Sequence, residues 1–347
     1  MASVLLLGAG ASKGTLREFA PTSAEFGEYL QKNVPSWSIE YQFLAAAVKF
    51  LGNRIPNTSL EAWALDKVWS AIDTRVKLQQ IWGLGLPGAL FPYIVKGVQR
   101  NDWDPWGIAG FELACLVARV YGDNLEDKIK KAAEGNGSLK TELDKLKGGD
   151  CVISFNYDLL AERILDKLAK EWIRANRYYE RIQRDNKILL NKPHGCLSWK
   201  GHFSEKECPV EILYGPMPER DIRPQVHPCL AAPVPFKSEI IDPTLQLNLA
   251  PNMFHLLVAQ WRSAIEYLSE ANKLVVMGYG FPSEDLYARY LFAEAAAKRD
   301  NEASLEVEVY EICRQRYDEV EKEIKKTFGP SRCHFTCKYK GKVEPAL

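Results

Sequence analysis

The chain opens with a continuous apolar run that leads directly into a glycine turn, and this combination most restricts the folds open to it. Val4–Leu7 is apolar at every position, as expected for a strand buried on both faces of a parallel sheet. Gly8 and Gly10 follow at once and allow a sharp reversal. A buried strand, a glycine turn and a helix in this order predict an α/β protein.

Strand patterns return in the second half of the chain. Apolar runs predict strands over 151–155, 187–191, 274–277 and 305–311. Helical patterns lie over 159–172, 260–271 and from about Ser283, while the Pro- and Gly-rich stretch 201–250 predicts loops with one strand at 210–214. Strands alternating with helices predict a Rossmann-like parallel sheet with helices on both faces.

The region from about 36 to 147 differs from both flanks. Helical patterns dominate it, and six of the nine tryptophans lie there. We therefore predict that residues 1–35 and 148–347 form the Rossmann-like core. Residues 36–147 are predicted to be a mainly helical insertion that packs an aromatic core of its own beside the sheet.

Composition narrows the function classes. Forty-five basic residues balance forty-five acidic ones, so no long-range field attracts nucleic acid or an anionic membrane, and we expect no direct binding to either. The longest apolar candidate, 82–95, is broken by Gly and Pro and is too short for a membrane span. With no signal-peptide pattern at the N-terminus, and cysteine spacing that suggests no disulfide framework, we expect a cytoplasmic protein.

The first glycine turn is a candidate phosphate site. Gly8, Gly10 and Gly14 follow a buried strand, and glycines there let the backbone approach a pyrophosphate at the N-terminus of the next helix. The third glycine is one place later than in the common dehydrogenase pattern, and an ordinary glycine-rich turn without a ligand is the alternative. We expect Gly8, Ala9, Gly10, Ala11 and Ser12 to bind a dinucleotide.

Polar residues follow the next two predicted strands. Asn156 and Asp158 stand just past the strand at 151–155, where open α/β sheets place their ligand contacts. Asp158 could equally cap the following helix. His194 lies in a Pro-His-Gly turn that would hold its ring rigidly, and its neutral-range titration suits a proton acceptor.

A second strand–glycine turn–helix unit contains Gly278, Tyr279 and Asp285. Ser283 is a natural N-cap, and acidic residues in the first helical turn favour the helix dipole. The alternative is that this turn forms the second wall of a dinucleotide site. Metal binding is not expected: paired C-x-x-C ligands are absent, and Cys333, His334 and Cys337 alone do not complete a tetrahedral zinc site.

Taken together and in order, the four segments resemble the sirtuin-like domains of bacterial antiphage defence. These segments are Gly8-Ala9-Gly10-Ala11-Ser12, Phe155-Asn156-Tyr157-Asp158, Pro193-His194-Gly195 and Val275-Val276-Met277-Gly278-Tyr279-Gly280 with Asp285. The resemblance implies cleavage of NAD at the nicotinamide–ribose bond, giving nicotinamide and ADP-ribose or a cyclised form. It covers about 35 N-terminal residues and most of 148–300, but not the helical region.

Carried over by position, the resemblance makes Asn156 and His194 the catalytic residues. It implies that Asp158 contacts the nicotinamide carboxamide and that Gly8–Ser12 bind the pyrophosphate. It also implies that Gly278 and Tyr279 lie beside the cofactor ribose. Two departures exist. The zinc module of the sirtuins is missing, and the stretch from Leu16 to Ser23 does not match the segment that closes over nicotinamide.

Other functions stay open at this point. A protein deacylase would need an acyl-lysine groove, which a zinc module usually helps to form. A silent NAD or ADP-ribose sensor would have no need of both Asn156 and His194. A dehydrogenase would need an acidic residue for the adenosine ribose at the usual spacing. We therefore expect an NAD glycohydrolase without a metal, gated by oligomerisation or by a partner defence protein.

Overall fold

The computed structural model describes most of the chain. The described residues are 2–52, 54, 58–82, 105–123, 125–174, 187–202, 211–212, 226–230, 251–282, 285–299, 303–328 and 335–346. Among the described residues, no helix is both long enough and apolar enough to cross a membrane.

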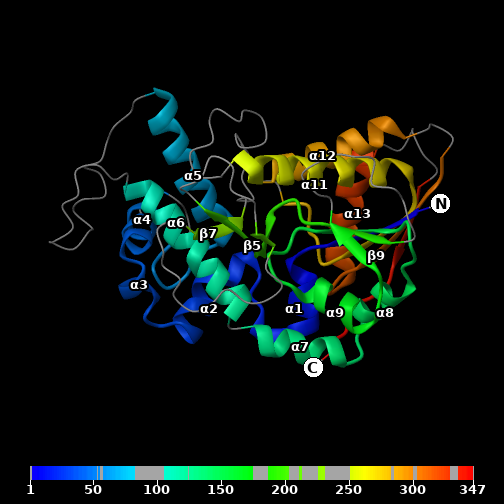
Figure 1. The fold of residues 1–347 in the computed structure, drawn as a ribbon, viewed down its shortest axis with the longest axis horizontal. Coiled ribbons are helices and arrows are strands. Elements are labelled where there is room, and N and C mark those ends of the chain that lie inside the picture. The colour runs from blue at the N-terminus through cyan, green and yellow to red at the C-terminus, as the bar shows by residue number, and fades with distance from the viewer. Residues whose placement is uncertain are drawn as a thin grey trace.

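A seven-stranded parallel sheet in the order β10-β9-β8-β1-β2-β4-β3 confirms the α/β prediction (Figure 1). Its strands are β1 (Ala2–Leu7), β2 (Cys151–Ser154), β3 (Trp172–Arg174), β4 (Ile188–Asn191), β8 (Ala271–Met277), β9 (Leu305–Tyr310) and β10 (Phe335–Tyr339). The chain starts at the centre with β1, fills one side through β2, and then switches to the other side at β8. In open parallel sheets such a switch point marks the ligand crevice at the carboxyl ends of the strands.

Alternate residues of each central strand face opposite layers, as the period of a β-strand requires. One face carries Val4, Leu6 and Val276 and packs against α11 (Pro251–Glu270), α12 (Leu286–Lys298) and α13 (Arg314–Phe328). The other carries Leu5 and Leu7. It is covered by α1 (Ala9–Leu16), α7 (Glu126–Glu134), α8 (Ser138–Lys145) and α9 (Leu160–Lys167). Figure 1 shows these two groups on opposite sides of the sheet.

Every element in the described part of 36–147 is a helix. Besides α7 and α8, they are α3 (Trp37–Glu40), α4 (Gln42–Gly52), α5 (Leu65–Trp82), α6 (Pro105–Ala118) and the π-helical turn η5 (Arg119–Asp123). They are preceded by η1 (Arg17–Phe19), η2 (Ser23–Glu25) and α2 (Phe26–Asn33). The helices α2–α6 lie together at the left of Figure 1.

The tryptophans of this region whose side chains the structure describes do not form a separate core. Trp37, Trp63 and Trp106 belong to the same continuous cluster of buried residues as Leu5 and Leu7 of β1. The aromatic contacts predicted there exist, since Trp63 lies edge-on to Phe26 and tilted against Trp37. The expected independent core is instead an extension of one face of the sheet. Whether 36–147 is an insertion between two halves of a core stays a prediction.

Two predicted helices have different bounds, and part of a small antiparallel sheet was not predicted. The helix expected over 159–172 ends at Lys167, and Trp172–Arg174 is the edge strand β3. The strand β5 (Gly195–His202), which pairs with β6 (Glu211–Ile212) and β7 (Val226–Leu230) in a small antiparallel sheet, was not predicted. The helix expected from Ser283 begins at Leu286, and its cap is Asp285, whose carboxylate accepts from the Ala288 amide.

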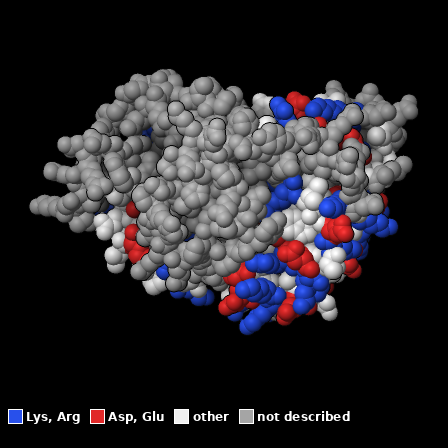
Figure 2. All heavy atoms as spheres, viewed as in Figure 1, with Lys and Arg blue, Asp and Glu red and all other residues white. Residues whose placement is uncertain are grey.

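The described surface carries mixed charge. Figure 2 shows Lys and Arg interspersed with Asp and Glu over the part of the surface that α7, α8 and α9 occupy in Figure 1. Several of these charges are paired, as in Lys145–Glu142, Lys167–Glu134 and Arg163–Glu126. This agrees with the absence of a net charge in the sequence.

Candidate functional site

The four predicted segments meet at the carboxyl edge of the central strands. The first glycine turn (Gly8–Ser12) follows β1, and the Asn156 loop (residues 155–159) follows the neighbouring strand β2. The His194 turn (residues 192–195) follows β4, and the second glycine turn (Gly278–Asp285) follows β8. The fold therefore brings together, at its switch point, the residues that sequence reasoning selected.

The two glycine turns pack against each other. The Gly10 amide donates to the Gly278 carbonyl at 3.0 Å, and a Cβ on Gly8 would lie 2.6 Å from that same oxygen. Gly278 has a φ of +60°, and a Cβ there would lie 2.1 Å from the Ala11 nitrogen. The sequence predicted these glycines as room for a pyrophosphate. The structure shows an additional reason for them, the close approach of one turn to the other.

The other residues of the first glycine turn begin the helix that follows it. Ala9 is the first residue of α1, and Ala11 is fully buried. Gly14, the third glycine of the pattern, faces the C-terminal segment, where an added Cβ would lie 2.6 Å from Cβ of Val343. Gly14 therefore serves the packing of α1.

Asn156 is held by the first glycine turn. It is 8% exposed, and its side-chain nitrogen donates to the Gly8 carbonyl and to Ser12 Oγ, both at 2.9 Å. Both amide hydrogens are thereby used. Since an amide has two N–H donors and one carbonyl acceptor, Asn156 has its Oδ1 left as the group to offer a ligand. It can accept a hydrogen bond from a ribose hydroxyl or from water.

Asp158 continues this chain of hydrogen bonds. Its Oδ2 accepts from Ser12 Oγ at 2.6 Å, and its Oδ1 accepts from the Leu160 amide at 3.0 Å. The second contact is an Asx turn just before α9, whose N-cap is Leu159 without a side-chain cap bond, so Asp158 is not the helix cap that the sequence left open as an alternative. Asp158 is 3% exposed, so it fixes the Asn156 loop against α1 from within the protein. Its predicted contact with nicotinamide stays a prediction.

His194 faces a carboxylate. Its Nε2 lies 2.8 Å from Oδ2 of Asp285, and the two residues are 4% and 1% exposed. The ring also lies edge-on to Phe155, with 4.9 Å between ring centroids. An ionised carboxylate at this distance stabilises the protonated imidazole and fixes its orientation. The pair places an imidazole beside a carboxylate where both are shielded from water.

The sequence placed Asp285 at the cofactor and did not foresee its contact with His194. The strands that precede the two residues, β4 and β8, have β1 and β2 between them. With about 4.8 Å between neighbouring strands, residues at the two strand ends would stand about 14 Å apart. The contact therefore depends on the segment between β8 and α12, at whose end Asp285 lies 2.8 Å from His194. A helix-starting Asp after a glycine turn was the available signal.

Tyr279, predicted to line the cofactor ribose, packs into the protein. It is 6% exposed and stacks on Phe155 with 4.7 Å between ring centroids. Burial raises its pKa well above the ordinary value, and the negative charge of Asp285 adds to this shift. Its ring belongs to the apolar cluster on the α11–α13 side of the sheet.

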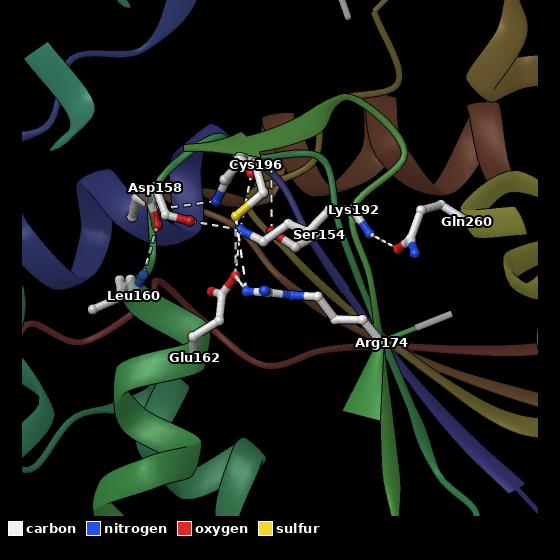
Figure 3. Close-up of polar contacts among 10 residues, drawn as sticks. Ser154, Asp158, Leu160, Glu162, Arg174, Lys192, Cys196 and Gln260 are labelled. Atoms are coloured by element: carbon white, nitrogen blue, oxygen red, sulfur yellow. Dashed lines mark hydrogen bonds and ion pairs between the residues drawn. The ribbon is translucent and has the colours of Figure 1, made fainter. Parts of the chain in front are cut away.

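Sequence reasoning missed Lys192, which is fully buried beneath the Asn156 loop (Figure 3). Its ammonium donates to the carbonyls of Asn156 and Asp158 at 3.0 and 2.5 Å and lies 3.4 Å from Glu162. Arg174 lies 2.9 Å from the same carboxylate. Burial alone would raise the pKa of Glu162, but Lys192 and Arg174 outweigh it and lower the pKa. A lysine directly after a buried strand was the only signal.

The helical region reaches the site through aromatic rings. Tyr157 of the Asn156 loop stacks on Trp69 of α5, with 5.7 Å between ring centroids. Its ring centroid lies 6.4 Å from that of Tyr121 of η5. The Tyr121 hydroxyl donates to the Pro21 carbonyl, in the stretch that departs from the sirtuin pattern. Burial raises the pKa of Tyr121 above its ordinary value, and the charge of Asp158 contributes. The Asn156 loop is therefore packed between sheet and helices.

Within the described residues, no group of three or more His, Cys, Asp and Glu side chains is arranged to hold a metal ion. Cys333 and His334 lie outside the described residues. No protein-family model matches this chain, and no curated protein is similar to it.

Proposed function

We propose that this protein hydrolyses NAD at the nicotinamide–ribose bond. The observation that carries the proposal is the meeting of Asn156 and His194 at one sheet edge, each buried and each held by charged or polar partners. Asn156 is anchored to the first glycine turn, and His194 faces Asp285. Strongly oriented polar groups in a dry site at the switch point of a parallel sheet are typical of catalysis.

The chemistry follows from what these groups can do. Water attacks C1′ of the nicotinamide ribose, the C1′–N bond breaks, and its electron pair returns to the pyridinium nitrogen. Asn156 Oδ1 would accept a hydrogen bond from the water or from a ribose hydroxyl and so orient it. His194 would take the proton that the water loses, with Asp285 stabilising the resulting imidazolium. The products are nicotinamide, ADP-ribose and one proton.

Attack by a group of the adenine moiety in place of water would give a cyclised ADP-ribose by the same bond cleavage. The resemblance to antiphage sirtuin-like domains supports a role as a defence effector that depletes NAD. It also supports gating by assembly or by a partner, so the assay must include the conditions under which such a partner is present.

The test is release of nicotinamide from NAD, with His194→Ala as the decisive variant. We expect turnover to fall by about 10²-fold or more while NAD affinity changes by less than about threefold, because the ring moves a proton. Affinity is measured separately by calorimetry. An activated wild-type protein that releases no nicotinamide, or a His194→Ala variant with wild-type turnover, would contradict the proposal. Binding of NAD without turnover would then indicate a sensor.

A further inference from the structure

Lys192 is a buried charge that the proposed chemistry does not use. It comes directly after β4, is 0% exposed, and has its backbone amide fixed by Oε1 of Gln260 at 2.7 Å. An ammonium without water must find charged and polar partners inside the protein, or the fold is destabilised. Its partners therefore show what the residue does.

Those partners are the backbone of the Asn156 loop. The ammonium donates to the carbonyls of Asn156 and Asp158, which flank Tyr157. Figure 3 shows the Lys192 side chain running under this loop, with Glu162 on its other side. The contacts join the end of β4 to the loop that follows β2, so one side chain connects the two halves of the candidate site.

The charge balance of this cluster makes its purpose testable. Glu162 stays ionised because Lys192 and Arg174 lower its pKa against the effect of burial. Arg174 lies 2.9 Å from Glu162 and is itself buried, with 6% of its side chain exposed. Removal of the lysine charge therefore leaves a complete Glu162–Arg174 ion pair.

The same residue also shapes the His194 turn. The Lys192 carbonyl accepts from the Gly195 amide at 2.9 Å, and Gly195 takes a φ of +84°. The backbone of Lys192 thus sets the turn that presents His194, while its side chain sets the loop that presents Asn156. Only rigid placement of both groups lets them act on one substrate atom, and small displacements are costly for rate.

We propose that Lys192 is a positioning residue that fixes the Asn156 loop relative to His194. The proposal rests on NAD hydrolysis as the function of this site. The ammonium touches no substrate atom. It acts by holding two backbone carbonyls, so its loss lowers the rate of the chemical step more than it lowers NAD binding.

The test compares Lys192→Met with Lys170→Met. Lys170 is a matched control, because it also donates to two backbone carbonyls, those of Asp144 and Leu146, at the end of α8. We expect kcat for nicotinamide release to fall about tenfold or more in Lys192→Met, with KM within about threefold. Lys170→Met should keep wild-type kcat. Lys192→Gln, which keeps an N–H donor without the charge, should recover part of the loss.

A second measurement does not depend on turnover. Hydrogen–deuterium exchange of peptides covering residues 155–160 should quicken in Lys192→Met and stay unchanged in Lys170→Met, at matched thermal stability. Wild-type kcat in a folded Lys192→Met, or equal exchange in both variants, overturns the positioning role. If Lys192→Met does not fold, Lys192→Gln decides on the same two readouts. An inactive wild type with quickened exchange in the variant refutes NAD hydrolysis but leaves the structural link standing.

Discussion

The two glycine turns begin from the same sequence pattern and end in different structures. After β1, the helix starts at once at Ala9, and the turn contributes contacts to Asn156 through Gly8 and Ser12. After β8, the chain passes through Gly278 with a positive φ and a second left-handed residue, Phe281, before α12 begins. The first turn is a short anchor. The second turn is longer, and at its end Asp285 lies 2.8 Å from His194.

A strand–glycine–helix pattern therefore predicts where a turn lies in the sheet, but it does not predict which residues the turn contacts. A helix that starts immediately keeps its backbone near the strand end. Where the helix starts later, as α12 does, a residue at its start can contact a residue that follows a distant strand, as Asp285 contacts His194. Variants in the two turns should therefore fail in different ways, and the largest difference should be in folding.

Gly278→Ala should destabilise the protein most. It places a side chain at a φ of +60° and brings a Cβ within 2.1 Å of the Ala11 nitrogen, whereas a Cβ on Gly10 meets Gly278 Cα at 2.8 Å. We expect Gly278→Ala to lower the free energy of unfolding by about 3 kcal/mol or more, and Gly10→Ala to cost less. Chemical denaturation of the two variants measures this. Equal losses would mean that the turns are equivalent.

Asp285→Asn should have the second largest effect, and this effect should be on the rate of turnover. Asparagine caps a helix about as well as aspartate, so α12 should persist, while the charge facing His194 is lost. We expect kcat for nicotinamide release to fall by about 10²-fold.

Ser12→Ala is the matched change in the first turn. It removes one hydrogen bond to Asn156 and one to Asp158, for which we expect a fall of about tenfold in kcat. A larger fall in kcat for Ser12→Ala than for Asp285→Asn would mean that the first turn contributes more to catalysis than the second.

Gly280→Ala should have the smallest effect of these variants on stability and turnover. Among the described residues, its added Cβ would meet only Nη2 of Arg316, at 3.1 Å, and this is the end of a flexible side chain. We expect a change of less than about 0.5 kcal/mol in the free energy of unfolding and wild-type turnover. A loss as large as that of Gly278→Ala would show that the whole second turn, and not one backbone conformation in it, is constrained.

The sequence was sufficient where short-range pattern determines structure. Apolar runs in the sequence identify buried strands directly. The strands β1, β2, β4, β8 and β9 were therefore predicted close to their observed bounds. The edge strand β3 was not, because its three residues are half-buried and show no period that would separate them from the preceding helix. The rule that carboxyl ends of parallel strands share an edge also placed Asn156, His194 and the glycine turns together.

What the sequence could not give are contacts that depend on the path of a turn. His194 and Asp285 meet across two intervening strands, and Lys192 reaches backbone carbonyls that carry no sequence signature. Backbone acceptors exist at every position, so their use by one lysine follows only from the three-dimensional course of the loop. The same holds for the packing of Gly278 on Ala11.

The continuity of apolar packing from β1 through Trp63 to Trp106 has a practical consequence for anyone seeking a minimal version of this protein. A shortened chain without residues 36–147 would keep α1 and α9 on this face of the sheet but lose α7 and α8, exposing apolar side chains that they cover. It would also remove Trp69 and Tyr121 from beside Tyr157. Bare apolar sheet faces promote association between molecules. A shortened version that keeps the buried packing around Tyr157 should therefore retain these helices together with the sheet.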